Sequence, residues 1–127
     1  MEQLPYRKLA ATAKAEGLAD MVLEIAESPE IGRRYWLARQ ISACAMSVPA
    51  NIAEGTGRGT NLDFASFVDR ARGSLFELDV WMRMCCRRGY ISTEQEQDIL
   101  ARVLEINAML YALRANLHRR DQDDRSR

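Results

Sequence analysis

The sequence feature that most restricts the fold is a repeated spacing of apolar side chains. In four segments, apolar residues recur alternately four and three residues apart, which places them along one side of an α-helix. The most regular of these segments keeps the alternation over three heptads, at Phe64, Val68, Ala71, Leu75, Leu78, Met82 and Cys85. A chain patterned in this way is predicted to be all-α, with no sheet.

The other three segments predict three further helices with the same spacing. The first is expected to end near Glu27, because proline in Ser28-Pro29 lacks a backbone donor and disfavours a helical residue before it. The second is expected to begin near Glu30 or Ile31. Their apolar positions are Ala11, Ala15, Leu18, Val22 and Ile25; Leu37, Ile41, Cys44 or Ala45, Val48 and Ile52; and Ile99, Val103, Ile106, Leu110, Leu113 and Leu117.

Short connections between the helices predict their topology. A glycine-rich stretch, 55–59, leads to Thr60, which has the position of a helix N-cap. Gly89 is expected to close the third helix, and Ser92 or Thr93 to cap the fourth. Amphipathic helices joined by such short connections pack antiparallel. The prediction is an up-down-up-down antiparallel four-helix bundle.

Length and charge limit what the chain can do. Its 127 residues fit a single domain over 1–127, with a lead-in at 1–9 and a polar tail at 119–127 that is expected to fray. The 18 basic and 18 acidic side chains give a formal net charge of +0, so no overall field attracts nucleic acid or acidic membranes. The sequence shows no signal peptide and no apolar run of membrane-spanning length, so a cytoplasmic location is expected.

Pro49 lies inside the second predicted helix. An internal proline costs about 3 kcal/mol unless the helix bends. Because the apolar spacing continues in phase beyond it, the sequence predicts a kink centred near Ala45 and Met46 rather than a break. Gly55 and Gly73 are predicted to allow close packing between helices, since they have no side chain to hold neighbours apart.

Six polar residues of the second and third helices form a candidate site. They suit either a ligand pocket or a buried structural network. Antiparallel packing could bring Glu54 towards Arg72, and Asn51 could satisfy carbonyl groups that Pro49 leaves free. We favour the structural network, because polar residues among apolar ones more often fix register than perform chemistry. The six are Ser47, Asn51, Glu54, Arg72, Ser74 and Glu77.

No residue pattern specifies catalysis, a metal or a cofactor. A di-iron bundle needs a Glu-x-x-His motif on each of two helices, and His118 is the one histidine. Cys85 and Cys86 are neighbours, so on a helix they point about 100° apart, which suits Cys85 to the core rather than to a redox pair. Nucleophilic catalysis lacks a base near any serine or cysteine. A non-enzymatic protein without metal or cofactor is expected.

Two features bear on anion or nucleic-acid binding. The stretch 55–60 precedes a helix and could cradle a phosphate, but it has no P-loop lysine, so we interpret it as a connection. Arg58, Arg87 and Arg88 are candidate nucleic-acid contacts only if an assembly gathers the scattered arginines along one rim or pore. We prefer their interpretation as a solvated face or interfacial salt bridges.

Three stretches resemble a known family, the "four helix bundle protein" family, also described as the 23S ribosomal RNA intervening-sequence proteins. They are Ala19 to Ile25, Gln40-Ile41 with Ser47-Val48-Pro49-Ala50-Asn51-Ile52-Ala53-Glu54-Gly55, and Ala71 to Leu78 with Gly89-Tyr90-Ile91. The resemblance implies the four-helix fold and a ring-shaped homopentamer. It implies no established activity. The family is similar to accessory proteins of diversity-generating retroelements, which bind a reverse transcriptase and nucleic acid and are strongly basic, unlike this chain.

Surplus apolar surface leads to the functional hypothesis. Beside its main stripe, the third helix carries a second, partly apolar row at Phe67, Ser74 and Trp81. One neighbour cannot cover both, so this helix is expected to be central or shared between subunits. The first hypothesis is therefore a self-associating platform for a protein partner. The alternative is a nucleic-acid-binding accessory protein.

Overall fold

The computed structural model describes residues 3–127, and within that range it contains helices and no strand. The elements are a 3₁₀ helix η1 (Pro5–Lys8), α1 (Ala10–Ala26), the one-turn α2 (Pro29–Gly32), α3 (Tyr35–Thr56), α4 (Asn61–Arg87) and α5 (Thr93–Arg125). The predicted all-α class is confirmed. Across 3–127, no helix is both long and apolar enough to cross a membrane.

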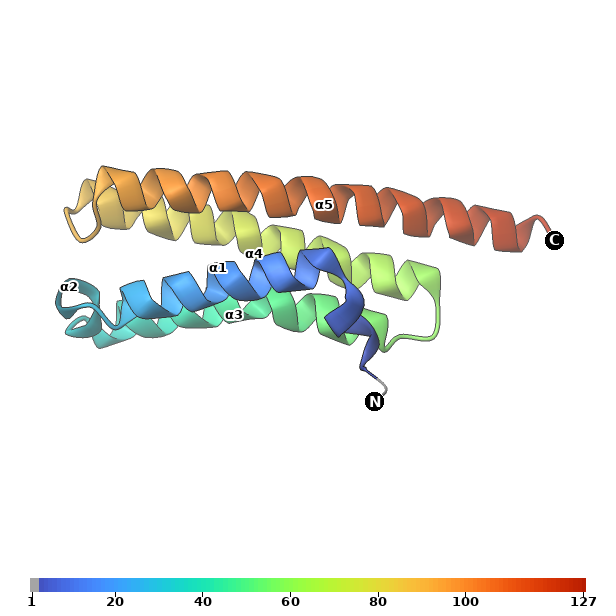
Figure 1. The fold of residues 1–127 in the computed structure, drawn as a ribbon, viewed down its shortest axis with the longest axis horizontal. Helices are drawn as coiled ribbons and strands as arrows, with labels where there is room; N and C mark the ends of the chain where they lie inside the picture. The colour runs from blue at the N-terminus through green and yellow to red at the C-terminus, as the bar shows by residue number, and fades with distance from the viewer. Residues whose placement is uncertain (1–2) are drawn as a thin grey trace.

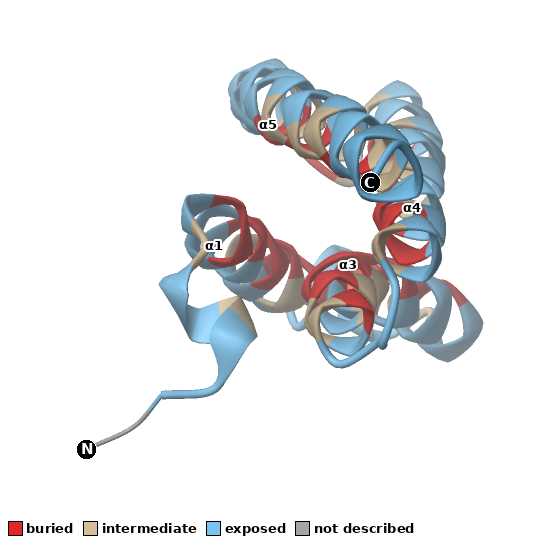
Figure 2. Ribbon diagram, turned by 90° about the vertical axis from the view of Figure 1, so that its right-hand side faces the viewer, coloured by how far each residue is buried: buried red, intermediate tan, exposed pale blue. Residues whose placement is uncertain are grey.

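The four long helices lie side by side, and the chain passes back and forth along them (Figure 1). The packing is most extensive between α3 and α4, followed by α4 and α5 and by α1 and α3, whereas α1 and α5 contact each other less. Viewed along the helices, the buried residues face the space that the four helices enclose (Figure 2). α3 and α4 are therefore the central helices, since each packs extensively on two neighbours.

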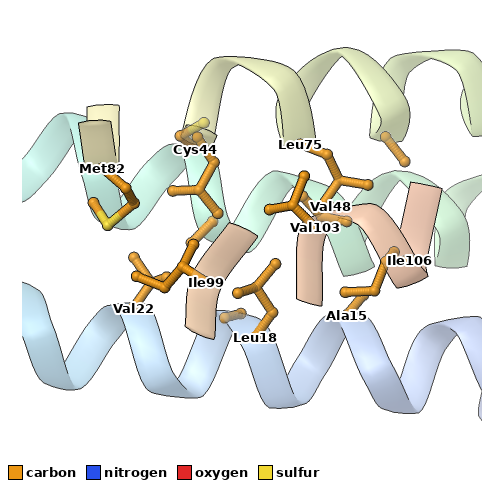
Figure 3. Packing of buried hydrophobic residues seen from close by; sticks show 14 of the residues in the cluster. Ala15, Leu18, Val22, Cys44, Val48, Leu75, Met82, Ile99, Val103 and Ile106 are labelled. Atoms are coloured by element: carbon orange, nitrogen blue, oxygen red, sulfur yellow. The ribbon is translucent and has the colours of Figure 1, made fainter. Parts of the chain in front are cut away.

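The buried side chains form one hydrophobic cluster, to which all four long helices contribute. Figure 3 shows Leu18, Val48, Leu75 and Ile99 converging there from α1, α3, α4 and α5. The predicted apolar stripes of the helices are buried, apart from Phe64 and Leu113, which are half-buried. The four-three spacing therefore located the inner face of each long helix.

The helix ends follow the capping chemistry expected from the sequence. The Thr60 hydroxyl accepts a hydrogen bond from the Asp63 amide at 3.1 Å, so Thr60 is the N-cap of α4. Ser92 caps α5, and a capping box with Gln95 closes at 3.1 and 2.8 Å. Gly89, with a φ of 77°, occupies the left-handed region just after α4. These predicted boundaries are confirmed.

The predicted start of the second helix is wrong. Pro29–Gly32 form a separate turn of helix, and α3 begins only at Tyr35. The cause is Arg34, whose φ of −99° and ψ of 77° lie outside the helical region. Ile31 is fully buried and holds the short α2 against the core.

The polar tail at 119–127 is helical, because α5 continues to Arg125, and its fraying remains a prediction. An ion pair of 3.1 Å joins Arg125 to Asp121 one turn earlier, and Asn61 at the start of α4 donates to Asp124 at 3.3 Å. The segment lacks glycine and proline, so polar composition alone does not end a helix. At the other end, the lead-in contains η1, and residues 1–2 lie outside the described range.

Pro49 does not interrupt α3, which runs continuously from Tyr35 to Thr56. The predicted absence of a break is therefore confirmed. The proline ring is buried. A kink centred near Ala45 and Met46 remains a prediction.

Candidate functional site

Part of the predicted polar set lies between α3 and α4. The hydroxyl oxygens of Ser47 and Ser74 are hydrogen-bonded at 2.6 Å, and the Cys44 thiol donates to the Ser74 carbonyl at 3.2 Å. Ser47 also lies 2.7 Å from the Cys44 carbonyl oxygen. These three residues, the α3–α4 polar cluster, tie the two central helices together at one level. Such a directional contact fixes the register of apolar helices that could otherwise slide.

The chemistry of this cluster is structural rather than nucleophilic. Burial raises the pKa of the Cys44 thiol to about 12, and the nearby Glu77 carboxylate adds to the effect. Burial also raises the pKa of Cys85. Because the thiolate is the reactive form, both groups remain neutral and unreactive near pH 7. Glu77 itself is exposed, so it borders the cluster from solvent.

The predicted approach of Glu54 to Arg72 does not occur. Glu54 is exposed and pairs with Arg58 at 3.0 Å. Arg72 instead donates from Nε to Asn107 Oδ1 on α5 at 3.0 Å. The Ser47–Ser74 contact sets a register in which Glu54 and Arg72 lie at different levels, and Arg72 faces the opposite neighbour. Arg72 therefore links α4 to α5, outside the α3–α4 polar cluster.

Asn51 also has a different role from the predicted one. Proline at position 49 leaves the Ala45 carbonyl without its usual amide donor, since a helical amide bonds four residues back. The Asn51 side chain donates to the Ser47 carbonyl at 2.7 Å instead. It thus reinforces the turn that carries Ser47, and the prediction that it compensates Pro49 is wrong.

The two glycines singled out for close packing behave differently. A Cβ atom at Gly55 would lie 2.7 Å from Phe64 Cδ1 and 3.0 Å from Phe67 Cβ, so the close approach of α3 and α4 there requires glycine. At Gly73 a Cβ atom would meet nothing within 4 Å. The prediction is confirmed for Gly55 and wrong for Gly73, which lies on an exposed side of α4.

The candidate nucleic-acid contacts lie far apart on a single chain. Arg58 precedes α4 and Arg87 ends it, and a helix of 27 residues is about 40 Å long at 1.5 Å per residue. The Arg58 guanidinium is already engaged, by Glu54 and by the Phe67 ring, whose centroid lies 4.5 Å away. Arg58, Arg87 and Arg88 therefore do not form one basic surface within the subunit.

An apolar surface that sequence reasoning missed lies on the outside of α4 and α5. Phe76 and Val80 are 51% and 57% exposed, and Leu104 and Tyr111 are both 59% exposed. The Arg72 guanidinium lies 6.0 Å from the Phe76 ring centroid and 5.3 Å from that of Tyr111, so the two helices share this surface. We call these four residues the outer apolar face.

The sequence did carry a signal for this surface. Phe76 and Val80 are four residues apart, and Leu104 and Tyr111 are seven apart, both of which place side chains on one side of a helix. The sequence pattern instead predicted surplus apolar surface at the row Phe67, Ser74 and Trp81. Phe67 is buried and the other two are half-buried, so that row belongs to the boundary between α3 and α4.

A groove on the opposite side of the molecule lies between α1 and α3. It has a volume of about 350 Å³. Small side chains, Ala19, Ala50 and Ala53, form part of its lining, and the carboxylates Glu16 and Asp20 line it as well. This α1–α3 groove thus combines room for a large apolar side chain with negative charge. In residues 3–127, no group of three or more histidine, cysteine, aspartate or glutamate residues is placed to hold a metal ion.

Comparison with known proteins gives the family. The sequence profile of the 23S rRNA-intervening sequence proteins matches residues 7–112. The chain belongs to this family. The match includes the α3–α4 polar cluster and the whole outer apolar face, and it ends before the last part of α5.

A solved structure extends the comparison to the fold. This family member is similar to a protein of unknown function from the S23 ribosomal protein family of Bacteroides thetaiotaomicron, with 22% identity and a TM-score of 0.75. The similarity covers 82% of this chain and 97% of the other. At that identity the likeness concerns the fold alone. No curated protein matches the chain.

Proposed function

We propose that this family member is a non-enzymatic, cytoplasmic subunit of a homo-oligomeric ring, of five copies, that serves as an interaction platform. Each subunit is an up-down-up-down four-helix bundle. The observation that carries the proposal is the outer apolar face, where four large apolar side chains from α4 and α5 are more than half exposed.

The energetics favour covering this face. Burying a large apolar side chain completely contributes about 1.5–3 kcal/mol, so covering side chains that are already half-buried contributes roughly 1 kcal/mol each. Exposed large apolar side chains that gather on one side of a molecule mark an interaction surface more often than scattered ones do. The face lies on helices that the hydrophobic core already holds rigid, so little ordering is needed on association.

A ring needs two different faces. A patch that pairs with its own copy closes a two-fold dimer, whereas a ring requires one surface to bind a different surface of the next subunit. The α1–α3 groove is suited to be that second surface, because its alanines leave room for Phe76 or Tyr111. Its carboxylates, Glu16 and Asp20, would face Arg83, an exposed residue three positions after Val80.

Mixing two variants tests this proposal. Phe76→Glu puts a charge on the outer apolar face, and Ala50→Glu puts one in the α1–α3 groove. Each variant alone should have the mass of a single subunit in light scattering. An equimolar mixture should form dimers, because one intact face then meets one intact groove. Gly17→Glu is the control, since it adds the same charge where a Cβ atom has nothing within 4 Å.

Several outcomes would contradict the proposal. A wild-type chain that remains a single subunit at high concentration would exclude self-association. If Ala50→Glu keeps the wild-type mass while Phe76→Glu dissociates, the outer apolar face pairs with itself and the ring is wrong. If the Gly17→Glu control also dissociates, added charge rather than the proposed contact explains the effect.

The same samples address the alternative, a nucleic-acid-binding accessory protein similar to those of diversity-generating retroelements. Such a protein should bind RNA or DNA with an affinity that falls steeply as salt rises, because neutralised phosphates release counterions. The separation of Arg58 from Arg87 and Arg88 argues against it for a single subunit. Salt-dependent binding by the wild type that Phe76→Glu abolishes would instead favour arginines gathered by the ring.

A further inference from the structure

A second cavity lies where the start of α3 meets the end of α4, and the proposed ring does not use it. Its volume is about 370 Å³, within the range of pockets that hold small molecules. It is lined by Trp36, Leu37, Trp81, Met84, Cys85, Arg88 and Tyr90. We call this the aromatic cavity.

The walls of the aromatic cavity favour a flat apolar ligand. Trp36 is 63% exposed although it adjoins the cavity, and Trp81 is half-buried on the facing helix. Aromatic side chains bind other rings by offset stacking or edge-to-face contact. Tyr90 is held in place, because the Arg34 guanidinium lies 4.1 Å from its ring centroid and also bonds to Glu30. This wall of the cavity is thus in place before any ligand binds.

The charge of one lining residue determines that the cavity favours a negatively charged ligand. Arg88 is the sole charged residue in the lining. Within residues 3–127 it forms no ion pair with a carboxylate, unlike Arg34 and Arg58. Arg88 is exposed, so the gain comes from the side of the guanidinium that borders the apolar walls, where the local dielectric constant is lower than in open water and an anion is attracted more strongly. The Cys85 thiol, whose pKa burial raises, is not suited to covalent capture.

We propose that the aromatic cavity binds a small aromatic anion, with its ring against Trp36 and Trp81 and its carboxylate or sulfonate paired with Arg88. The apolar walls supply most of the affinity, and the guanidinium selects the charge. This site lies where the start of α3 meets the end of α4, and Met84 in its lining is one helical turn from Val80 of the outer apolar face.

The chain is well suited to a fluorescence test, since Trp36 and Trp81 are its two tryptophans. The full-length protein is titrated with 1-anilinonaphthalene-8-sulfonate, an aromatic anion, and separately with N-phenyl-1-naphthylamine, its neutral analogue. We expect one dye per chain, with tryptophan emission quenched by energy transfer. Arg88→Leu should weaken binding of the sulfonate by about tenfold and leave the neutral dye within about twofold, because one charge-assisted contact is lost.

Two further variants complete the test. Arg87→Leu removes the neighbouring charge, which does not line the cavity, and should leave both dyes unaffected. Trp36→Ala changes an exposed side chain, so the protein should fold, and both dyes should bind more weakly. Equal effects of Arg87→Leu and Arg88→Leu would overturn the assignment of the anion to Arg88. Dye binding that Phe76→Glu abolishes and Trp36→Ala leaves intact would place the ligand on the outer apolar face instead and overturn the proposed site.

Discussion

The inner and outer faces of α4 carry similar apolar residues, but those of the inner face are buried and those of the outer face are exposed. Leu75 and Leu78 are fully buried, whereas Phe76 and Val80, one and two residues further on, are 51% and 57% exposed. Neighbouring positions differ by about 100° around a helix, so a single step moves a side chain from core to surface. The inner face is covered by the other helices of the same chain. The outer face has no such cover within the chain, and in the proposed ring a neighbouring subunit covers it.

The largest expected effect separates these faces directly. Leu75→Ala should lower the free energy of unfolding by about 3 kcal/mol, because it removes fully buried methyl groups and leaves a cavity. Phe76→Ala, at the next position, should change it by less than about 0.5 kcal/mol when subunits are separate. Urea unfolding at low protein concentration measures both. Equal losses would show that the two faces do not differ in the way the exposures indicate.

The next effect concerns the close approach of α3 and α4 on the inner side. Gly55→Ala should destabilise the subunit by about 1–3 kcal/mol, because the new methyl group collides with Phe64 and Phe67. Gly17→Ala is the matched control in α1, where space is open, and should stabilise it by about 0.5–1 kcal/mol. Thermal unfolding of both variants gives the comparison. Unchanged stability of the Gly55→Ala variant would mean that α3 and α4 can move apart there without loss of free energy.

Alkaline pH tests the buried thiol of the α3–α4 polar cluster. In the unfolded chain Cys44 should ionise near the ordinary value of 9.0, but in the fold only near 12. The neutral form is thus favoured by folding, and its contribution is lost as pH rises through that interval. Stability should fall by up to about 1.4 kcal/mol per pH unit within it. Cys44→Ala should show a shallower decline in urea unfolding between about pH 9 and pH 11; parallel curves would disprove the assignment.

The smallest expected difference in stability is between losing a half-buried polar contact and losing an exposed one. Ser74→Ala removes the hydroxyl that bonds Ser47 and should cost about 1 kcal/mol. Glu54→Gln weakens only the exposed pair with Arg58 and should cost less than about 0.5 kcal/mol. Chemical unfolding resolves this difference when the two variants are measured together. If Glu54→Gln lost more stability than Ser74→Ala, the predicted role of Glu54 in a structural network would be supported after all.

Much of the fold was predictable because its signals are local. Apolar residues four and three apart define a helix face from neighbouring positions alone, and Thr60 and Ser92 cap their helices through amides three residues away. The start of α3 was missed because Arg34 leaves the helical region without proline or glycine at that position. Polar residues that bury nothing, as in the tail at 119–127, can still be helical when they pair along the helix.

The candidate site was predictable only in part. Ser47 and Ser74 are hydrogen-bonded as a pair, but Glu54 and Arg72 lie at different levels and bond to other residues. Which polar residues touch depends on the register between two helices, and a shift of one turn changes every pair. The outer apolar face depends further on which neighbour covers each side of α4. Spacing along one helix does not contain that information.

The sequence by itself determined that this chain is helical, where α4 and α5 begin, and which side of each long helix faces inward, since all three follow from contacts within a few residues. Only the tertiary structure decided that Gly55 lies against Phe64 and Phe67, that Gly73 lies in open space, and that Phe76 and Val80 remain exposed. Those outcomes depend on how distant helices pack, because close packing and exposure are properties of the assembled side chains rather than of any one segment.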